Sequence, residues 1–264
     1  MPAFTAKDVQ ALRQSTGVGM LDAKRALEEN GGNLEEAVQW LRVQGLASAA
    51  KRSDREASQG VVAIGKAGDN ASIVELRSET DFVAKNEDFV GLAQRMADAV
   101  AADGASAIDA FAGEVETMLT TLKENISVGR VEQVVGGAGI SIATYLHVQS
   151  GRGVNGVVVA LKDGSEELAH EVAVHAAFTK PAYLSRDEVP EADVAAERAT
   201  VEDISRNEGK PEAALPKIIE GRLNGWFKER CLLEQAYVRD EKQTVEQLLG
   251  SASIAQFAQV VIGA

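Results

Sequence analysis

The stretch VVAIGKAGDNASIVELRSETDFVAKNEDFVGLAQRMADAVAA, residues 61–102, decides the fold. Residues 61–66 and 72–77 are rich in β-branched side chains, and the turn sequence Gly68-Asp69-Asn70 lies between them, which predicts a β-hairpin. Asn86 is a favoured N-cap, and the apolar residues after it recur at helical spacing, so we expect a helix over 86–102. Those apolar residues are Phe89, Ala93, Met96, Ala97 and Val100. A hairpin followed by a helix is a unit of the α+β class.

A similar order recurs further along the chain. After a helix near 114–126 we expect strands near 128–135, 140–149 and 156–162, and then a helix over 165–178. This recurrence predicts that the core is an internal duplication of an α+β unit. The first core subdomain is expected to span 60–138, and the second to combine 139–190 with 231–264.

The connection between hairpin and helix differs between the two copies. In the second copy two or three residues join the last strand to the helix, whereas in the first copy the segment SETDFVAK, residues 78–85, intervenes. A long connection in a compact unit often carries function, and this one places Phe82 beside the carboxylate of Asp81. The alternative is structural, with Phe82 and Val83 packing back onto the next helix as a hydrophobic staple.

The first part of the chain, residues 1–45, is predicted to be a three-helix bundle, because apolar residues recur at helical spacings and glycines separate three short segments. Asn33 is expected to cap the third helix, with Glu36 completing a capping box, and Gly45 to end it. Residues 46–59 are expected to be a partly helical linker. A bundle of this size has a small core, which favours recognition over catalysis.

Two helices over 191–208 and 215–230 are predicted to form an antiparallel helical hairpin, a protruding domain of residues 191–230. Pro216 is compatible only with the first turn of the second helix. The remaining expected elements are a short helix near 244–249 and a strand-like segment over 254–262.

The composition is that of a folded, acidic protein. The 264 residues are 45% hydrophobic and 25% charged, with a formal net charge of −13 at pH 7. An acidic surface repels phosphate backbones and anionic lipids, so we expect neither nucleic acid nor a membrane as a partner. The single cysteine, Cys231, and an N-terminus without the pattern of a signal or transit peptide predict a cytoplasmic location.

Two segments match motifs of nucleotide-binding or catalytic proteins only in part. GRGVNG, residues 151–156, has the G-x-G-x-x-G spacing, but a strand follows it where a dinucleotide site needs a helix, so we interpret it as a hairpin turn. HEVAVH, residues 170–175, resembles a zinc-peptidase helix, but a five-residue spacing places its two rings about 140° apart, too far to share a metal. Phosphate-binding loops and nucleophile elbows are absent, so we expect no catalytic residue, no metal site and no cofactor.

Three stretches of the sequence carry a family resemblance. The first is RQSTGVGMLDAKRAL, residues 13–27, and the second is TDFVAKN, residues 80–86. The third runs from Lys210-Pro211 through EGRL, residues 220–223, to CLLEQ, residues 231–235, and KQTVEQLL, residues 242–249. In this order and spacing they resemble the bacterial translation elongation factor Ts family over nearly the whole chain.

The resemblance implies an α+β fold with an N-terminal ubiquitin-associated-like bundle, duplicated core subdomains and a helical hairpin. It implies a guanine-nucleotide exchange factor rather than an enzyme. Such a factor binds elongation factor Tu in its GDP-bound and nucleotide-free forms, promotes GDP release by disturbing the magnesium and phosphate site, and needs no cofactor. In some relatives two copies pair through the core, so the resemblance also admits a homodimer. Many members continue into a C-terminal helical module that has no counterpart after the last expected strand here.

The resemblance also implies which positions contact Tu. They are Arg13, Met20, Leu21, Thr80, Asp81, Phe82, Val83, Leu122 and His147. The three bundle positions would grip the nucleotide domain, the four consecutive positions would intrude beside the magnesium, and His147 would touch another domain of Tu. For His147 the alternative is a hydrogen-bonded histidine within a strand. For the whole chain the alternative is a non-exchange adaptor or chaperone-like interaction module.

Overall fold

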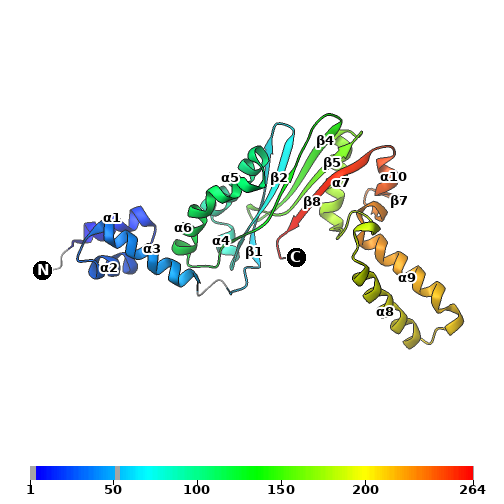
Figure 1. The fold of residues 1–264 in the computed structure, drawn as a ribbon, viewed down its shortest axis with the longest axis horizontal. Helices are drawn as coiled ribbons and strands as arrows, with labels where there is room; N and C mark the ends of the chain where they lie inside the picture. Colours follow the sequence, from blue (N-terminus) through cyan, green and yellow to red (C-terminus); the bar gives the residue numbers. More distant parts are fainter. Residues whose placement is uncertain (1–3, 51–53, 264) are drawn as a thin grey trace. The chain divides into compact units, whose positions relative to one another are not determined.

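The computed structural model describes residues 4–50 and 54–263, and of residues 46–50 it describes the backbone alone. Two compact units are distinguished by their internal contacts. The first consists of Met1–Gln133, Leu146–Gly156 and Val260–Ala264, and the second of Val134–Tyr145 and Val157–Gln259. The chain combines helices with antiparallel sheets, which confirms the predicted α+β class (Figure 1).

The predicted N-terminal three-helix bundle is confirmed. Its helices are α1 (Ala6–Thr16), α2 (Met20–Glu29) and α3 (Leu34–Ala50). Gly17 adopts the left-handed conformation, with φ of 71°, that ends α1. The bundle has an apolar core of its own, formed by the buried residues Val9, Leu12, Ala23, Ala26, Leu27 and Ala37.

The start of α3 agrees with the sequence, but its predicted end does not. Asn33 caps the helix, because its Oδ1 accepts the Glu35 backbone N–H at 3.0 Å, while its side-chain amide donates to Glu36 at 3.0 Å. The prediction that Gly45 ends the helix is wrong, since α3 continues to Ala50. A glycine inside a helix costs only about 1 kcal/mol. Here it also permits a close approach, because a Cβ on Gly45 would lie 2.6 Å from Cγ2 of Thr120.

The predicted linker is therefore partly helix and partly strand. Residues 46–50 belong to α3, residue 59 begins the first strand, and 51–53 lie outside the described residues.

The first sheet has the order β1–β2–β3. Its strands are β1 (Gln59–Ala67), β2 (Asn70–Ser78) and β3 (Ser127–Val134), and β1 and β2 form the predicted antiparallel hairpin. Helix α5 (Glu87–Asp103) packs on this sheet and is capped by Asn86, as predicted. A 3-10 helix, η1 (Ala105–Phe111), and α6 (Ala112–Leu122) follow. Helix α6 ends before the predicted residue 126, because Lys123 is left-handed with φ of 60°.

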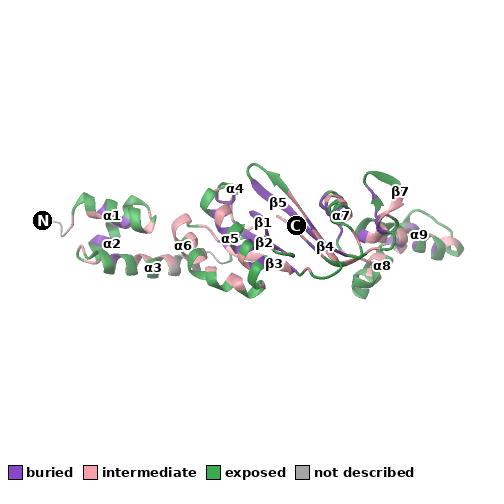
Figure 2. Ribbon diagram, turned by 90° about the horizontal axis from the view of Figure 1, so that it is seen from above, coloured by how far each residue is buried: buried purple, intermediate pink, exposed green. Residues whose placement is uncertain are grey.

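The second sheet has the order β4–β5–β8. Its strands are β4 (Ile140–Gln149), β5 (Arg152–Lys162) and β8 (Ser253–Val261). Helix α7 (Glu166–Thr179) is capped by Ser165, whose side chain accepts the Leu168 N–H. Strand β5 is buried along most of its length, as its purple stretches in Figure 2 show.

The two sheets share one connectivity, which confirms the duplicated core. Each has a hairpin, then a helix, then a third strand that pairs with the second strand of the hairpin. The strand predicted over 128–135 lies within the first core subdomain as predicted, 60–138. Strand β3 belongs to the first sheet and corresponds to β8 in the second.

The helical hairpin is present as α8 (Glu191–Asn207) and α9 (Leu215–Arg230). Short 3-10 helices η2 (Arg186–Glu188), η3 (Glu212–Ala214) and η4 (Leu232–Glu234) adjoin them. Pro216 lies in the first turn of α9, where the missing N–H costs nothing. The buried seam between the helices consists of Val201, Leu215, Ile219 and Leu223.

One hairpin was missed by the sequence reasoning. It consists of β6 (Ala236–Tyr237) and β7 (Asp240–Thr244), which pair antiparallel ahead of α10 (Val245–Leu249). These strands are short and mostly exposed, so they lack the apolar alternation that predicts a strand.

Candidate partner-binding surface

The segment between β2 and α5 is an ordered turn of helix rather than an open loop. Helix α4 (Asp81–Ala84) is a single turn, and Thr80 is its N-cap, with Oγ1 accepting the Val83 N–H at 3.4 Å. The backbone N–H groups of Ala84 and Lys85 donate to the carbonyls of Thr80 and Asp81 at 3.2 and 3.1 Å. Three backbone N–H groups of this turn, those of Val83, Ala84 and Lys85, are therefore satisfied from within it.

Two glutamates fasten this turn to the segment after α6. The Thr80 N–H donates to Glu124 Oε2 at 3.0 Å, and the Thr80 hydroxyl donates to the other oxygen of that carboxylate. The carboxylate of Glu79 accepts the Asn125 N–H at 2.6 Å. Hydrogen bonds to a carboxylate are stronger than those between neutral groups, so the start of α4 is held at two adjacent points.

The side chains of α4 point in opposite directions. Val83 is 8% exposed and Ala84 fully buried, and Val83 packs in the core with Phe89. Phe82, one position earlier, is 83% exposed. The staple alternative therefore holds for Val83 and fails for Phe82. Because most of the Val83 side chain lies in the core, little of it is accessible to a partner, and its predicted contact stays a prediction.

The acid beside Phe82 is paired within the same turn. Lys85 Nζ donates to Asp81 Oδ2 at 2.5 Å, and both side chains are partly exposed. This hydrogen bond, together with the charges of Lys85 and Arg152, holds the pKa of Asp81 below its usual range. Asp81 is therefore a solvent-accessible carboxylate at neutral pH, next to an exposed aromatic ring.

A cavity of about 550 Å³ lies between α4 and the tip of the β4–β5 hairpin. Ser150 and Gly151 form a two-residue turn with φ of 53° and 81°, as a type I′ hairpin requires. This confirms the interpretation of GRGVNG as a turn. The residues lining the cavity are Gln59, Glu79, Thr80, Asp81, Phe82, Lys85, Gln149, Ser150 and Arg152.

The sequence reasoning missed Gln149, Ser150 and Arg152 as members of this surface. The only signal for them was the turn motif itself, which says nothing about what the turn lies against. His147 is exposed near this tip on β4, and Val148 beside it is 55% exposed. His147 thus lies within a strand with its side chain exposed, and its contact with a partner stays a prediction.

The other predicted contacts lie at the corner between α1 and α2. Arg13 is exposed near the end of α1, and Met20 and Leu21 are 51% and 82% exposed at the start of α2. An apolar pair this exposed marks a contact surface more than a core. Leu122 differs, because its half-buried side chain packs against the core of the first sheet, so its predicted partner contact is not supported.

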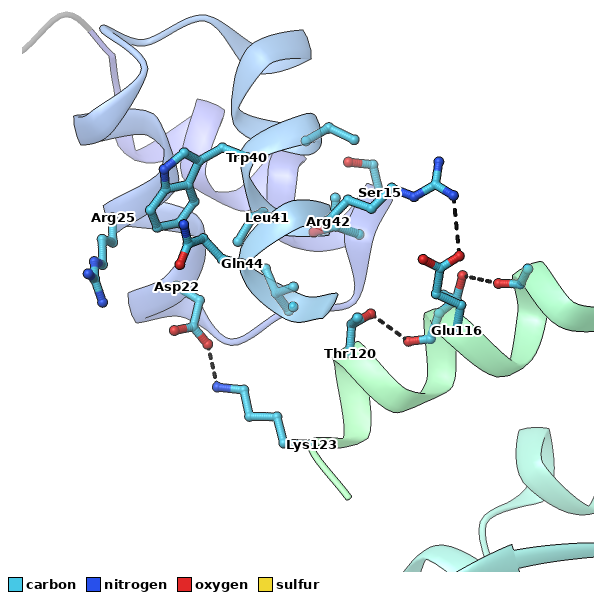
Figure 3. A pocket seen from close by; sticks show the side chains of 16 residues that line it. Ser15, Asp22, Arg25, Trp40, Leu41, Arg42, Gln44, Glu116, Thr120 and Lys123 are labelled. Carbon is cyan, nitrogen blue, oxygen red and sulfur yellow. Dashed lines mark hydrogen bonds and ion pairs between the residues drawn. The ribbon is translucent and has the colours of Figure 1, made fainter. Parts of the chain in front are cut away.

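The bundle contacts α6 within the first unit. Lys123 Nζ pairs with Asp22 at 2.5 Å, and Arg42 pairs with Glu116 at 3.2 Å (Figure 3). A cavity of about 600 Å³ lies between these ion pairs, with Trp40 and Thr120 in its lining. Exposed ion pairs contribute little stability, so these two pairs add little to a contact that also includes the packing of Gly45 against Thr120.

Within residues 4–50 and 54–263 we find no group of three or more histidine, cysteine, aspartate or glutamate side chains arranged to hold a metal. In the same part of the chain, no helix combines the length and the apolar character needed to cross a membrane.

Comparison with known proteins identifies the family. Residues 79–264 match the family model described as elongation factor TS. The chain is similar to elongation factor Ts of Beutenbergia cavernae, with 43% identity, and of Clavibacter michiganensis, with 44% identity, each comparison covering both chains completely. Elongation factor Ts of Mycobacterium avium is 41% identical over all of this chain and 99% of its own.

The chain belongs to the elongation factor Ts family. It is a translation elongation factor acting in protein biosynthesis. The family match begins at Glu79 and so includes the whole of α4, while the full-length similarity to the relatives extends over the bundle.

Proposed function

We propose that this protein is a guanine-nucleotide exchange factor for elongation factor Tu. In this proposal it binds Tu·GDP, inserts Phe82 beside the magnesium and phosphate site, and lowers the affinity of Tu for GDP. The observation that carries the proposal is Phe82 itself, a ring that is 83% exposed on a turn fixed by Thr80 and Glu124. A fixed ring can displace packed side chains of a partner, whereas a mobile one would yield.

The proposal requires binding energy rather than catalytic residues. If the factor binds nucleotide-free Tu more tightly than Tu·GDP, linkage requires that it weaken GDP binding by the same factor. An effect of ~10⁴-fold requires about 5.5 kcal/mol of differential binding. Burial of one phenylalanine contributes only about 1.5–3 kcal/mol. Phe82 therefore needs the support of other contacts.

The exposed residues of the bundle are suited to that support. We propose that Arg13, Met20 and Leu21 grip the nucleotide domain of Tu and that His147 contacts a second domain. Met20 and Leu21 present a small exposed apolar surface, and Arg13 is an exposed positive charge near the end of α1. Only the part of this binding that is stronger in the nucleotide-free complex contributes to exchange.

Asp81 has a separate proposed role. Its carboxylate is ionised at neutral pH, and the hydrogen bond from Lys85 favours the ionised form by lowering the pKa of Asp81. Placed near the magnesium of Tu, it would compete with the GDP phosphates and with the protein groups that hold the metal. Loss of that neutralisation would loosen GDP.

The test is the release of fluorescent GDP from Tu. We expect substoichiometric amounts of the chain to accelerate release, because an exchange factor is regenerated after each event. Tight binding to Tu without acceleration would favour the adaptor or chaperone-like alternative. Calorimetry should detect no stoichiometric GTP binding to the purified chain, and such binding would contradict a role limited to the partner's nucleotide.

A further inference from the structure

The segment GRGVNG does more than turn the chain. Gly153 and Gly156 lie within β5, where a turn needs no glycine. A Cβ on Gly153 would lie 2.2 Å from the carbonyl oxygen of Val62, and one on Gly156 would lie 2.8 Å from Cδ1 of Ile73. Position 153 therefore requires glycine for the start of β5 to lie against β1, because the clash there is with backbone. At position 156 a side chain would force Ile73 and Val62 to shift.

Arg152 stands between the turn and these glycines and is buried, with 9% exposure. Its guanidinium donates to the carbonyl oxygen of Gly60 and, at 2.9 Å, to Oε1 of Gln59. Both acceptors are at the start of β1. The planar fork of an arginine can reach two acceptors at once, so it fixes the base of the β4–β5 hairpin tip to β1 at two points.

The same guanidinium faces the α4 turn. Arg152 and Asp81 line one cavity, and the charge of Arg152 contributes to the lowered pKa of Asp81 after that of Lys85. The charged groups facing Arg152 across the cavity are Glu79, Asp81 and Lys85. Arg152 thus connects β1 with the hairpin that carries His147, and its field reaches the turn that carries Phe82.

We propose that Arg152 is a positioning residue for exchange, which holds the β4–β5 tip and the α4 turn in one fixed arrangement. This proposal rests on the proposed exchange function. Segments that move independently must be ordered when a partner binds, and that ordering lowers affinity. With Arg152 in place the β4–β5 tip and the α4 turn are already ordered in the free protein, so Phe82 and His147 can contact Tu at the same time.

Three variants test this role. Arg152→Met removes the charge and both hydrogen bonds, and Arg152→Lys keeps the charge but cannot hold both acceptors. Arg186→Met is the matched control in the second unit, because Arg186 also joins elements by donating to Asn224 at 2.8 Å and to Glu234. All rates are measured at a temperature where each melting curve shows the variant to be folded.

We expect Arg152→Met to lower the GDP-release rate by about tenfold, in keeping with the large effects of small misplacements. Arg152→Lys should remain impaired, and Arg186→Met should release GDP like the parent. An Arg152→Met protein that exchanges like the parent, or full recovery in Arg152→Lys, would overturn the proposal.

Two further measurements separate positioning from simple loss of stability. In the free protein, a carbon-13 titration should show the pKa of Asp81 raised by Arg152→Met and retained by Arg152→Lys. The effects of Phe82→Ala and His147→Ala on release should be coupled in the parent and additive in Arg152→Met. An unchanged Asp81 pKa or unchanged coupling would contradict the role. Failure of the parent to accelerate release would refute the exchange function itself. The Asp81 titration is done on the free protein, so its result does not depend on that function.

Discussion

Phe82 combines large exposure with a fixed backbone, and these two properties predict opposite responses of stability and function. Phe82→Ala removes a ring that is 83% exposed, so the free energy of unfolding should change by much less than the 3–5 kcal/mol or so lost with a buried phenylalanine. GDP release should nevertheless slow. A thermal melt and a release assay on the same preparation measure both.

The chain offers two control phenylalanines for this substitution, one exposed and one buried. Phe178, in the second unit, is 78% exposed, so Phe178→Ala should change neither stability nor release. Phe89 is fully buried, so Phe89→Ala should destabilise the fold strongly. A Phe82→Ala protein that melts like Phe89→Ala yet exchanges at the parent rate would show that the ring is structural.

His175 belongs to the HEVAVH segment, which resembles a zinc-peptidase motif, but in the structure it is a buried, hydrogen-bonded side chain. It is buried on α7, where Nε2 lies 3.0 Å from Oε1 of Gln235 and Nδ1 accepts the Val238 N–H at 3.3 Å. Thr179 also donates to Gln235, at 2.7 Å. This network ties α7 to the β6–β7 hairpin. Burial lowers the pKa of His175, so the folded protein holds the ring neutral.

This histidine predicts a pH dependence of stability. The unfolded chain takes up a proton near pH 6.5, while the folded protein does so only at lower pH. Its contribution is therefore complete above pH 6.5 and is lost as pH falls toward the folded pKa, by at most about 1.4 kcal/mol per pH unit. Urea unfolding between pH 5 and 7 should show this slope, roughly over the range in which histidine titrates.

The control for His175 lies on the same helix. His175→Gln should abolish this part of the slope, whereas His170→Gln, at an exposed position, should retain it. Equal slopes in the two variants would assign the pH dependence to other groups.

At the scale of elements, α4 depends on its cap. Thr80→Ala removes the N-cap hydroxyl and its hydrogen bond to Glu124, and should cost about 1 kcal/mol of stability. It should also loosen the turn and slow GDP release. Thr244 is the matched control, because it caps α10 in the second unit, with Oγ1 accepting the Gln247 N–H at 3.2 Å.

Thr244→Ala should therefore lose similar stability and keep the parent exchange rate. If both variants slow release equally, the effect follows stability and not the geometry of α4. Denaturant unfolding gives the stability of each variant, and fluorescent GDP gives the rate.

The elements also show where local sequence signals succeed and fail. Caps correctly located the starts of α3 and α5, because a cap is a contact between residues two or three apart. Signals for helix ends were weaker. Gly45 did not stop α3, since packing against Thr120 favours a glycine there within the helix. The ends of helices are thus decided partly by neighbours distant in sequence.

At the scale of the whole molecule, the bundle is separable from the core. It has its own apolar core, and it meets α6 through two ion pairs, each worth at most about 1 kcal/mol, and through the packing of Gly45 against Thr120. Removal of residues 1–50 should leave the remainder folded. Its affinity for Tu should fall by at least about tenfold, because burial of Met20 and Leu21 is lost and each 1.4 kcal/mol is a factor of ten.

The double variant Met20→Ala/Leu21→Ala of the full-length chain tests the same surface without a truncation. It should reproduce much of the loss in calorimetry with nucleotide-free Tu, with an unchanged melting curve. A dissociation constant that survives both changes would remove the bundle from the interface.

The sequence by itself determined the longer helices, the β1–β2 and helical hairpins, the duplicated core and the extra segment before α5, because these follow from periodicity and from contacts between near neighbours. It did not determine the short, mostly exposed β6–β7 hairpin. Nor did it determine which way the residues of the segment before α5 face. The outward direction of Phe82 and the burial of Val83 depend on the phase of one helical turn, which Thr80 and Glu124 fix across 44 residues. The link from Arg152 to Gly60 spans 92 residues. Only the tertiary structure brings such positions together, because periodicity carries no information about packing partners so far apart along the chain.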